Sequence, residues 1–307
     1  MKIDSILHNA STRDRERIIH HKTMPSEADM LFIKSSSDIG AIRNAGRRGA
    51  NFGPEALIAI VKKLALHTRE TWSEIELSDS QLELEDFDFS QKKYIQKLTT
   101  LYETYHRAQK FIYLGGGHDH IYPVLKSLNT IHKKIVVINI DAHLDTRIDD
   151  FHNSGTPFRQ FANEFEGTFK LIQLGIHDFA NSKSTMNELG SAREIVATYD
   201  DLRHLTINFT QNRKVFERMI PYERDTLYIF SLDADALEAG VMEGVSAVNH
   251  RGLPYTFVDE LLNYSINNLR VKHFGFYEYN PIFDNLSQKG ARILSSLIYQ
   301  IMDTSLT

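Results

Sequence analysis

The stretch "NIDAHLDTR" (139–147) sets a histidine between two aspartates directly after an apolar run. Asp141, His143 and Asp145 are each two positions apart. A straight strand rises about 3.3 Å per residue, which would separate Asp141 from Asp145 by roughly 13 Å, too far for both to bind one ion. Either the chain turns sharply after Asp141, or the three residues serve more than one metal ion.

Two other clusters complete a possible metal site. "SLDAD" (231–235) carries Asp233 and Asp235 at the same spacing, and "GGGHDH" (115–120) places His118 after three glycines. The three clusters together supply four carboxylates, which balance two divalent ions, and two imidazoles. Two-metal hydrolytic sites hold their ions about 3.5–4 Å apart. An oxygen-rich site with one imidazole per ion suits manganese, with iron, cobalt or zinc as substitutes.

Each cluster also has a purely structural interpretation. A single D-x-H-x-D or D-x-D can be a polar loop, a cap or a surface turn. "GGGHDH" can be a tight turn before a helix that Asp119 caps. Three such clusters, each at the end of an apolar run, favour a metal site over three unrelated turns.

The elements that must position these residues are apolar runs of strand length, which alternate with stretches of helical spacing. The runs cover 30–33, 110–116, 133–141, 169–176, 225–235 and 271–279, and the helical stretches include 54–67 and 291–303. This alternation predicts an α/β fold with three layers, in which helices cover both faces of a central, mostly parallel sheet. Ligands of such sheets lie beyond the carboxyl ends of the strands. The polar clusters, together with "EYNP" (278–281), follow four of the predicted strands.

Composition excludes several kinds of site and partner. The chain has no cysteine, which rules out disulfides, thiolate zinc sites and iron–sulfur clusters. A formal net charge of -5 argues against nucleic acid and anionic membrane as partners. No stretch approaches the roughly 18 apolar residues of a membrane span, and the N-terminus lacks the apolar core of a signal peptide. A cytoplasmic location is therefore expected.

The chain shows no boundary that would divide it. It contains no repeat, low-complexity tract or Pro/Gly-rich linker, so one domain over residues 1–307 is predicted. The acidic stretch 77–90 is expected to form a surface connection or the start of a helix.

The order of the motifs resembles the ureohydrolase family, which includes arginase, agmatinase and formimidoylglutamase. Members carry Gly-Gly-x-His, Asp-Ala-His-x-Asp and Ser-x-Asp-x-Asp, and these supply the six ligands of a dimanganese cluster. The resemblance implies an arginase-like fold, two Mn2+ per chain, and a homo-oligomer, a trimer or hexamer. The implied ligands are His118, Asp141, His143, Asp145, Asp233 and Asp235. The resemblance extends from about residue 38, through "GAIRNAGRRGANFGPEAL" (40–57), to "EYNP" (278–281).

The stretch "SGTPFRQF" (154–161) bears on the member of the family. Arginases have Ser-Gly-Asn-x-His-Gly, whereas this chain has Thr156 in the asparagine place and Phe158 in the histidine place, which is similar to formimidoylglutamases. The implied substrate is N-formimidoyl-L-glutamate, a small-molecule amidine with two carboxylates. Arg159 and Thr156 are the candidate substrate contacts, since a guanidinium can bind a carboxylate bidentately. Arg147 is a second candidate for that carboxylate.

Three weaker candidates for the substrate carboxylate, and one candidate for proton transfer, lie elsewhere in the chain. The weaker arginines are Arg43, Arg47 and Arg48. Without the arginase histidine, another histidine such as His177 could serve the leaving nitrogen. A structural or surface role for His177 is favoured.

The resemblance also implies a mechanism for histidine degradation. A metal-bridging hydroxide would attack the amidine carbon and release L-glutamate and formamide. Glu278 would hold the amidinium, and Asp145 would carry the proton to the departing amine. The chain departs from the family pattern after Asp235, where Glu238 replaces an aspartate, which leaves the shape of the substrate loop open.

Two other functions fit the same residues. A guanidino hydrolase acting on arginine, agmatine or a guanidino acid would release urea. A non-catalytic metal-binding protein would hold the ions without turnover. A nucleotide site at "YLGGGHDH" is disfavoured because neither G-x-G-x-x-G nor a Walker lysine is present.

Overall fold

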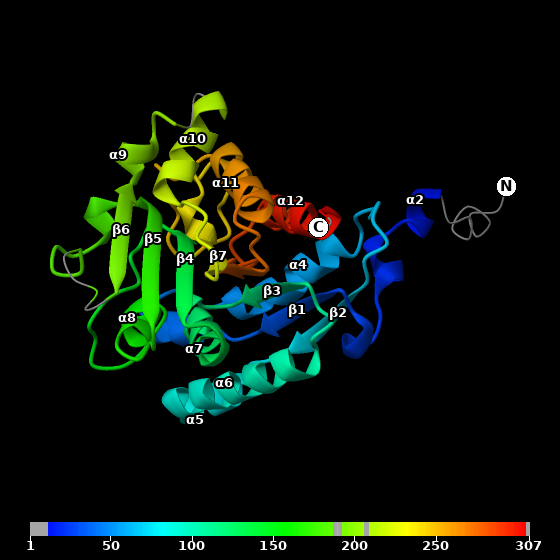
Figure 1. Ribbon diagram of the computed structural model, residues 1–307, viewed down its shortest axis with the longest axis horizontal. Coiled ribbons are helices and arrows are strands. Elements are labelled where there is room, and N and C mark those ends of the chain that lie inside the picture. Colours follow the sequence, from blue (N-terminus) through cyan, green and yellow to red (C-terminus); the bar gives the residue numbers. More distant parts are fainter. Residues whose placement is uncertain (1–11, 187–188, 190–191, 206–208, 305–307) are drawn as a thin grey trace.

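A single eight-stranded sheet organises the computed structural model, which describes residues 12–186, 189, 192–205 and 209–304. The strand order is β2-β1-β3-β8-β7-β4-β5-β6, and every pairing in it is parallel (Figure 1). The strands are β1 (Met30–Ser35), β2 (Trp72–Glu76), β3 (Lys110–Gly115), β4 (Lys134–Ile140), β5 (Thr168–Ile176), β6 (Arg193–Thr198), β7 (Leu227–Asp233) and β8 (His273–Tyr277).

Helices cover both faces of the sheet, as the alternation of apolar runs predicts. On one face α4, α10, α11 and α12 pack over a large apolar core, and on the other α6, α7 and α8 pack over a second (Figure 1). The three-layer α/β/α prediction is confirmed. The helices are α2 (Thr12–Arg15), α3 (Ile39–Arg43), α4 (Gly53–Val61), α5 (Ser80–Glu85), α6 (Phe87–Thr104), α7 (Ile121–Ile131), α8 (Pro157–Ala162), α9 (Tyr199–Leu202), α10 (Phe209–Met219), α11 (Tyr255–Asn267) and α12 (Lys289–Asp303).

The six predicted strands are present, and the two missed strands lie at the edges of the sheet. β2 reads WSEIE and β6 reads REIVAT. An edge strand pairs on one side only and tolerates charged side chains, so neither segment has the continuous apolar run by which the inner strands were recognised. The inner strands β3 and β8 are buried along their whole length.

The first predicted helix is shorter than its apolar spacing indicates. The pattern from Pro54 runs to His67, but α4 ends at Val61. Beyond it, the backbone bonds to a segment near the N-terminus: Ile18 N donates to Leu64 O, and Leu66 N donates to Glu16 O. Pairing with this segment therefore replaces the last turn of the helix.

The acidic stretch 77–90 contains two helix starts. The carboxylate of Asp79 accepts from the backbone N–H groups at the start of α5, and that of Asp86 accepts from Phe89 N at the start of α6. Aspartate is a preferred N-cap because its oxygen satisfies backbone donors that have no partner inside the helix. Of the two alternatives predicted for this stretch, the start of a helix is correct.

The parallel pairing brings all the carboxyl ends of the strands to one edge. β8, the last strand in the sequence, lies between β3 and β7. The four clusters that follow β3, β4, β7 and β8 therefore converge at the middle of this edge.

Among the described helices, none combines the length and apolar character that crossing a membrane requires.

Candidate metal centre

The chain turns sharply after β4, and this turn resolves the spacing of Asp141 and Asp145. Asp145 has a φ of 51°, in the left-handed region, which reverses the direction of the chain. Asparagine and aspartate are the residues other than glycine that adopt this conformation most readily. The reversal brings the carboxylates of Asp141 and Asp145 to the same imidazole, that of His118.

The two-residue spacing produces the same local turn in both aspartate motifs. His143 N donates to Asp141 Oδ1 at 2.7 Å, and Asp235 N donates to Asp233 Oδ1 at 2.9 Å. In each case the first carboxylate binds the backbone two residues later, which folds the chain back on itself. The side chain at the third position then faces the same site as the first.

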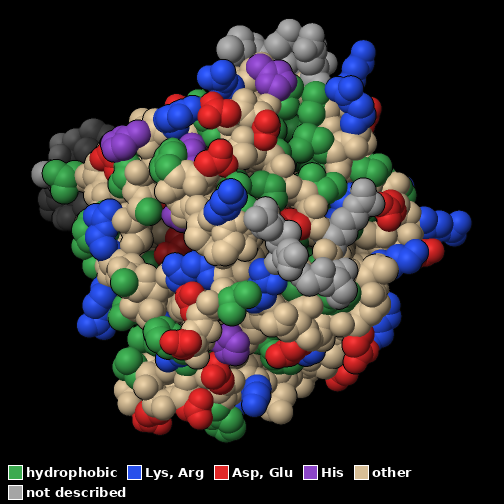
Figure 2. Space-filling view, turned by 90° about the vertical axis from the view of Figure 1, so that its left-hand side faces the viewer, with side chains coloured by type: hydrophobic (Ala, Val, Ile, Leu, Met, Phe, Trp, Pro, Cys, Tyr) green, Lys and Arg blue, Asp and Glu red, His purple; other side chains and the backbone are tan. Residues whose placement is uncertain are grey.

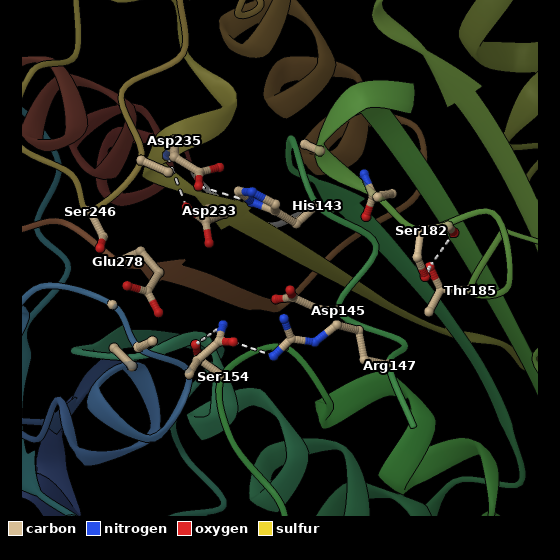
Figure 3. Close-up of a pocket in the computed structure, with 18 residues that line it drawn as sticks. His143, Asp145, Arg147, Ser154, Ser182, Thr185, Asp233, Asp235, Ser246 and Glu278 are labelled. Carbon is tan, nitrogen blue, oxygen red and sulfur yellow. Dashed lines mark hydrogen bonds and ion pairs between the residues drawn. The ribbon is translucent and has the colours of Figure 1, made fainter. Parts of the chain in front are cut away.

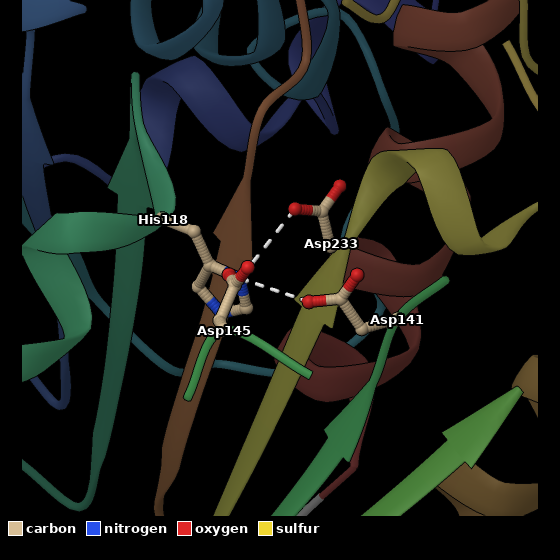
Figure 4. Close-up of side chains that lie close together, drawn as sticks. All are labelled: His118, Asp141, Asp145 and Asp233. Carbon is tan, nitrogen blue, oxygen red and sulfur yellow. Dashed lines mark ion pairs between the residues drawn. The ribbon is translucent and has the colours of Figure 1, made fainter. Parts of the chain in front are cut away.

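The ligand candidates form two groups that share Asp141. In the first, His118 Nδ1 lies 2.9 Å from Asp145 Oδ2, 3.1 Å from Asp141 Oδ2 and 3.4 Å from Asp233 Oδ2 (Figure 4). In the second, His143 Nδ1 lies 3.1 Å from Asp235 Oδ2 and 3.6 Å from Asp141 Oδ1. Within each group, one donor atom from every residue lies within 4.8 Å of all the others. Each oxygen of Asp141 thus faces a different group.

Burial and mutual repulsion shape the protonation of this cluster. Burial raises the pKa of Asp145 to about 6, and the nearby Asp141 carboxylate adds to the rise. Burial and Asp235 raise the pKa of Asp233 well above its usual range. Burial acts to raise the pKa of Asp141, but the imidazoles of His118 and His143 outweigh it and hold the pKa low. Divalent cations would relieve this repulsion and favour the ionised carboxylates.

His118 is held firmly from three sides. Its Nε2 lies 2.9 Å from Ser231 Oγ. Its ring stacks on that of Tyr277, with ring centroids 4.8 Å apart, and lies nearly perpendicular to that of Phe158, with centroids 5.5 Å apart. With Nε2 as donor to the hydroxyl, Nδ1 presents its lone pair to the carboxylates. The backbone at Gly116 lies close to the backbone of Ser37. A Cβ on Gly116 would lie 1.9 Å from Ser37 O, so only glycine fits there.

A cavity of about 410 Å³ opens onto these ligands. His143, Asp145, Asp233, Asp235 and Glu278 line it, and Figure 3 shows Glu278 and Arg147 on opposite sides of the space. Figure 2 views the molecule from the left-hand side of Figure 1. It shows a hollow with recessed acidic side chains beside cationic ones, drawn in blue.

Glu278 lies beside His118 on the wall of the cavity. His118 N donates to its Oε1 at 3.0 Å, and its own N donates to Gly116 O at 2.8 Å. The residue has a φ of 60°, a left-handed conformation that turns the chain at the end of β8. Burial raises the pKa of this carboxyl to about 8.

The residues named as substrate contacts lie in different places. Arg147 lines the cavity, and its buried Nε has no hydrogen-bond partner. Arg159 is not among the residues that line the cavity, and its Nε donates to Thr146 O at 3.0 Å. Thr156 does not line it either, because its hydroxyl exchanges hydrogen bonds with the backbone of Asn153.

The remaining candidates are outside the cavity lining. Arg43 Nε donates to His152 O, and Arg47 Nε donates to Ser246 O. His177 is buried and stacks on Tyr199 at 5.5 Å, and burial lowers its pKa. This position agrees with the structural role that was favoured for His177.

Sequence reasoning missed several polar residues that line the cavity. Ser154 and Gly155 are the first two residues of the "SGTPFRQ" segment, and their place beside Arg147 could have been proposed from it. The others come from the segment 40–57 or from loops without a recognised motif, and only the fold brings them to the site. They are Asn44, Asn181, Ser182, Thr185 and Ser246.

Comparison with known proteins identifies the class of this fold and site. The model of the arginase family matches residues 29–303. The chain belongs to the arginase family.

Curated relatives and solved structures agree with this assignment. The chain is 28% identical to a formimidoylglutamase of Legionella pneumophila (strain Paris), over 93% of this chain and 88% of the relative. It is 30% identical to a formimidoylglutamase of Klebsiella pneumoniae, over 89% and 85%. Its fold is similar to those of the formimidoylglutamase of Bacillus subtilis (TM-score 0.81, 19% identity, 98% and 97% covered) and the formiminoglutamase of Trypanosoma cruzi with Mn2+2 (TM-score 0.77, 20% identity, 93% and 97% covered). Family and relatives together support a metal-dependent amidino hydrolase.

Proposed function

We propose that the chain hydrolyses N-formimidoyl-L-glutamate to L-glutamate and formamide at a dimanganese centre. The observation that carries the proposal is the pair of ligand groups that share Asp141, on the wall of a cavity that Glu278 and Arg147 also line. The curated relatives named above are formimidoylglutamases.

The donor set fits two divalent cations. His118 Nδ1, which faces three carboxylates, is buried and makes no hydrogen bond of good geometry, as expected of an atom that faces a metal ion. Four carboxylates and two imidazoles match manganese in ligand type and balance two ions in charge. When bound, such a pair makes a water acidic enough to react as hydroxide near neutral pH.

Glu278 supplies the site for the cationic end of the substrate. Its carboxylate lies on the cavity wall, and the backbone of His118 fixes one of its oxygens. An amidinium placed against this carboxylate is oriented with its carbon facing the ligands of the metal centre. Orientation of this kind converts binding into a faster reaction because the reacting atoms already lie in place.

Arg147 supplies the site for a substrate carboxylate. Its guanidinium contacts Asn44 Oδ1 and lies 2.9 Å from Asp149 Oδ2, and its buried Nε makes no hydrogen bond. A Cβ on Gly155 would lie 2.9 Å from Arg147 Cζ, so glycine is needed for the guanidinium to lie there. A carboxylate of the glutamate would pair with this guanidinium, since Arg147 lines the cavity.

Asp145 is the proton carrier in this proposal. Phe158, in the place of the arginase histidine, is fully buried against His118 and has no proton to transfer. Asp145 lines the cavity and takes the proton of the attacking water. The C–N bond to the glutamate then breaks, the oxygen stays on formamide, and the proton passes to the departing amine.

The test is a product assay on manganese-loaded protein with separate detection of glutamate, formamide, ammonia and urea. Equal amounts of glutamate and formamide are expected from N-formimidoyl-L-glutamate. Urea from arginine, agmatine or a guanidino acid, without reaction of the amidine, would replace the proposal by a guanidino hydrolase. Bound manganese without any turnover would indicate a metal-binding protein.

The assembly is proposed on the resemblance, whereas the single domain and the location are proposed on the sequence composition. We propose one domain per chain, a homo-oligomer of three or six copies, and a cytoplasmic location. Size-exclusion chromatography with light scattering gives the mass of the assembly, and a monomer at micromolar concentration would contradict it.

A further inference from the structure

We propose that Arg159 and Gln173 are positioning residues that hold the metal-binding loop 141–147 in the shape its ligands need. This inference rests on the proposed dimanganese site and assigns to Arg159 a role other than binding the substrate. The loop reverses direction at Asp145, the left-handed residue of the metal centre. A conformation of this kind persists where the surrounding structure fixes it.

Three consecutive backbone carbonyls of the loop each accept a hydrogen bond from outside it. Leu144 O accepts from Gln173 Nε2 at 2.7 Å, and Asp145 O accepts from Phe158 N at 3.2 Å. Thr146 O accepts from Arg159 Nε at 3.0 Å. Leu144, Asp145 and Thr146 are all buried, so a carbonyl that lost its donor would have little water to replace it.

Gln173 also reaches the first ligand of the loop. It is fully buried in β5, next to β4, and its Oε1 accepts from Asn139 Nδ2 at 2.8 Å. The same Asn139 amide lies 3.4 Å from Asp141 Oδ2. One glutamine side chain therefore contacts both ends of the turn, through the Leu144 carbonyl and, by way of Asn139, the carboxylate of Asp141.

Arg159 acts on the far side of the reversal. It lies on α8, and Glu194 of β6 is near enough for the guanidinium to lower the pKa of that carboxyl, against the larger effect of burial, which raises it. Gln173 Nε2 lies 3.4 Å from Glu194 Oε1. The arginine, the glutamate and the glutamine thus form one polar group next to the loop, and none of the three lines the cavity.

The expected effect of breaking this group is a loss of metal affinity. Side chains that orient metal ligands commonly change metal affinity or activity by about 10–100-fold when removed. Gln173→Leu and Arg159→Met keep much of the side-chain volume and remove the donors to Leu144 O and Thr146 O. A substrate contact, in contrast, would change the Michaelis constant of a charged substrate and leave metal binding unaltered.

The experiment measures Mn2+ binding by equilibrium dialysis and by electron paramagnetic resonance, without substrate. Both variants are expected to bind at least one Mn2+ about tenfold more weakly or worse. At a low Mn2+ concentration, both are also expected to lose the electron paramagnetic resonance signal of a spin-coupled manganese pair. Arg159→Lys, which can still reach a carbonyl with one donor, is expected to recover part of the affinity. Gln160→Leu is the matched control, because this buried glutamine of α8 donates to Gln91 Oε1 at 2.8 Å instead.

Kinetics with two substrates separate the possible roles of Arg159. With manganese below saturation, Arg159→Met is expected to lower turnover of N-formimidoyl-L-glutamate and of an uncharged N-alkylformamidine by the same factor. An increase of the Michaelis constant for the charged substrate alone, with unchanged Mn2+ binding, would overturn the inference. Equal Mn2+ binding by Gln173→Leu, Arg159→Met and Gln160→Leu would also overturn it. If no amidine is hydrolysed, the metal-binding measurements still show whether Arg159 and Gln173 position the loop. Failure of the proposed function is therefore distinguishable from failure of this inference.

Discussion

The two ring nitrogens of His118 have separate tasks, and this division illustrates how single residues define the site. Nε2 faces the hydroxyl of Ser231, and Nδ1 faces three carboxylates. The contact with Ser231 holds the ring so that Nδ1 faces the carboxylates, which is the usual role of a second hydrogen bond on a ligating histidine.

Replacing Glu278 by glutamine tests the amidinium site. Glu278→Gln keeps an oxygen for the bond from His118 N and removes a carboxyl that a bound amidinium would hold in its ionised form, against the burial that raises its pKa. Loss of orientation at the reacting carbon is expected to lower kcat/KM for amidines by about 100-fold. Steady-state kinetics with bound manganese measured in parallel provide the check. A fall in metal content equal to the fall in rate would assign Glu278 to the metal site instead.

Replacing Arg147 tests the carboxylate site. Arg147→Gln removes the charge whose Nε is buried without a partner in the cavity wall. Loss of a charge-assisted hydrogen bond, about 1.5–3 kcal/mol, is expected to raise KM for N-formimidoyl-L-glutamate by about tenfold or more. The KM for an uncharged amidine serves as the control. Equal increases for both substrates would contradict the assignment.

His273 makes stability depend on pH. Burial lowers its pKa to about 3 from a usual 6.5, and its Nδ1 lies 2.8 Å from Tyr113 OH. Between these values the unfolded chain binds a proton that the folded chain does not, so the free energy of unfolding falls as pH falls through this window. The slope is about 1.4 kcal/mol per pH unit for this group.

The His273 contribution is measured by urea unfolding at several pH values from 6.5 downward. His273→Phe keeps the stacking on Phe111 and is expected to show a shallower slope than the unmodified chain. Tyr113→Phe removes the hydrogen-bonding hydroxyl but not the titrating group, so its slope is expected to stay the same. Identical slopes for all three proteins would exclude this role of His273.

At the scale of elements, the segments that carry the site are fixed by short polar contacts with their neighbours. The inner strands and the ligand clusters could be predicted from the sequence because continuous apolar runs and i, i+2 carboxylates are local signals. β2, β6 and the end of α4 could not, since edge pairing and the contact of Leu64 with Ile18 are set by residues far apart in the chain. The same limit explains why Arg159 was expected in the cavity: its partner, Thr146 O, is a backbone atom of another segment.

The cap of α6 offers a prediction for one element. Asp86 Oδ1 accepts from Phe89 N at 3.0 Å, and Asp86→Ala leaves that donor unsatisfied. A loss of about 1 kcal/mol in the free energy of unfolding is expected. Lys92→Ala, at an exposed position later in α6, serves as the control in urea unfolding. An equal effect of the two variants would contradict the role of the cap.

At the scale of the whole molecule, the ligands come from separate crossovers of the sheet, so bound ions join distant segments. His118 follows β3, Asp141 follows β4, and Asp233 ends β7. A ligand that binds only the folded chain raises its stability by mass action.

Metal removal is therefore expected to lower the melting temperature. Stabilisation at a free Mn2+ concentration of 100 times Kd is about 2.7 kcal/mol. Asp141→Ala removes the carboxylate shared by both ligand groups and is expected to abolish the increase on adding Mn2+, together with amidine hydrolysis. Scanning calorimetry with and without chelator measures the difference. Activity unchanged by Asp141→Ala or Asp235→Ala would exclude the dimetal mechanism.

The central position of β8 has a consequence for biosynthesis. β1, β2 and β3 form one part of the sheet, β4 to β7 form the other, and β8 alone joins them between β3 and β7. His118 belongs to the first part, and the aspartates belong to the second. Until residues 273–277 have left the ribosome, the nascent chain has no β8 to join the two parts of the sheet. We therefore expect residues 273–277 to be needed before the ligands of the two parts lie in their final places, so that metal binding would follow synthesis of the last strand.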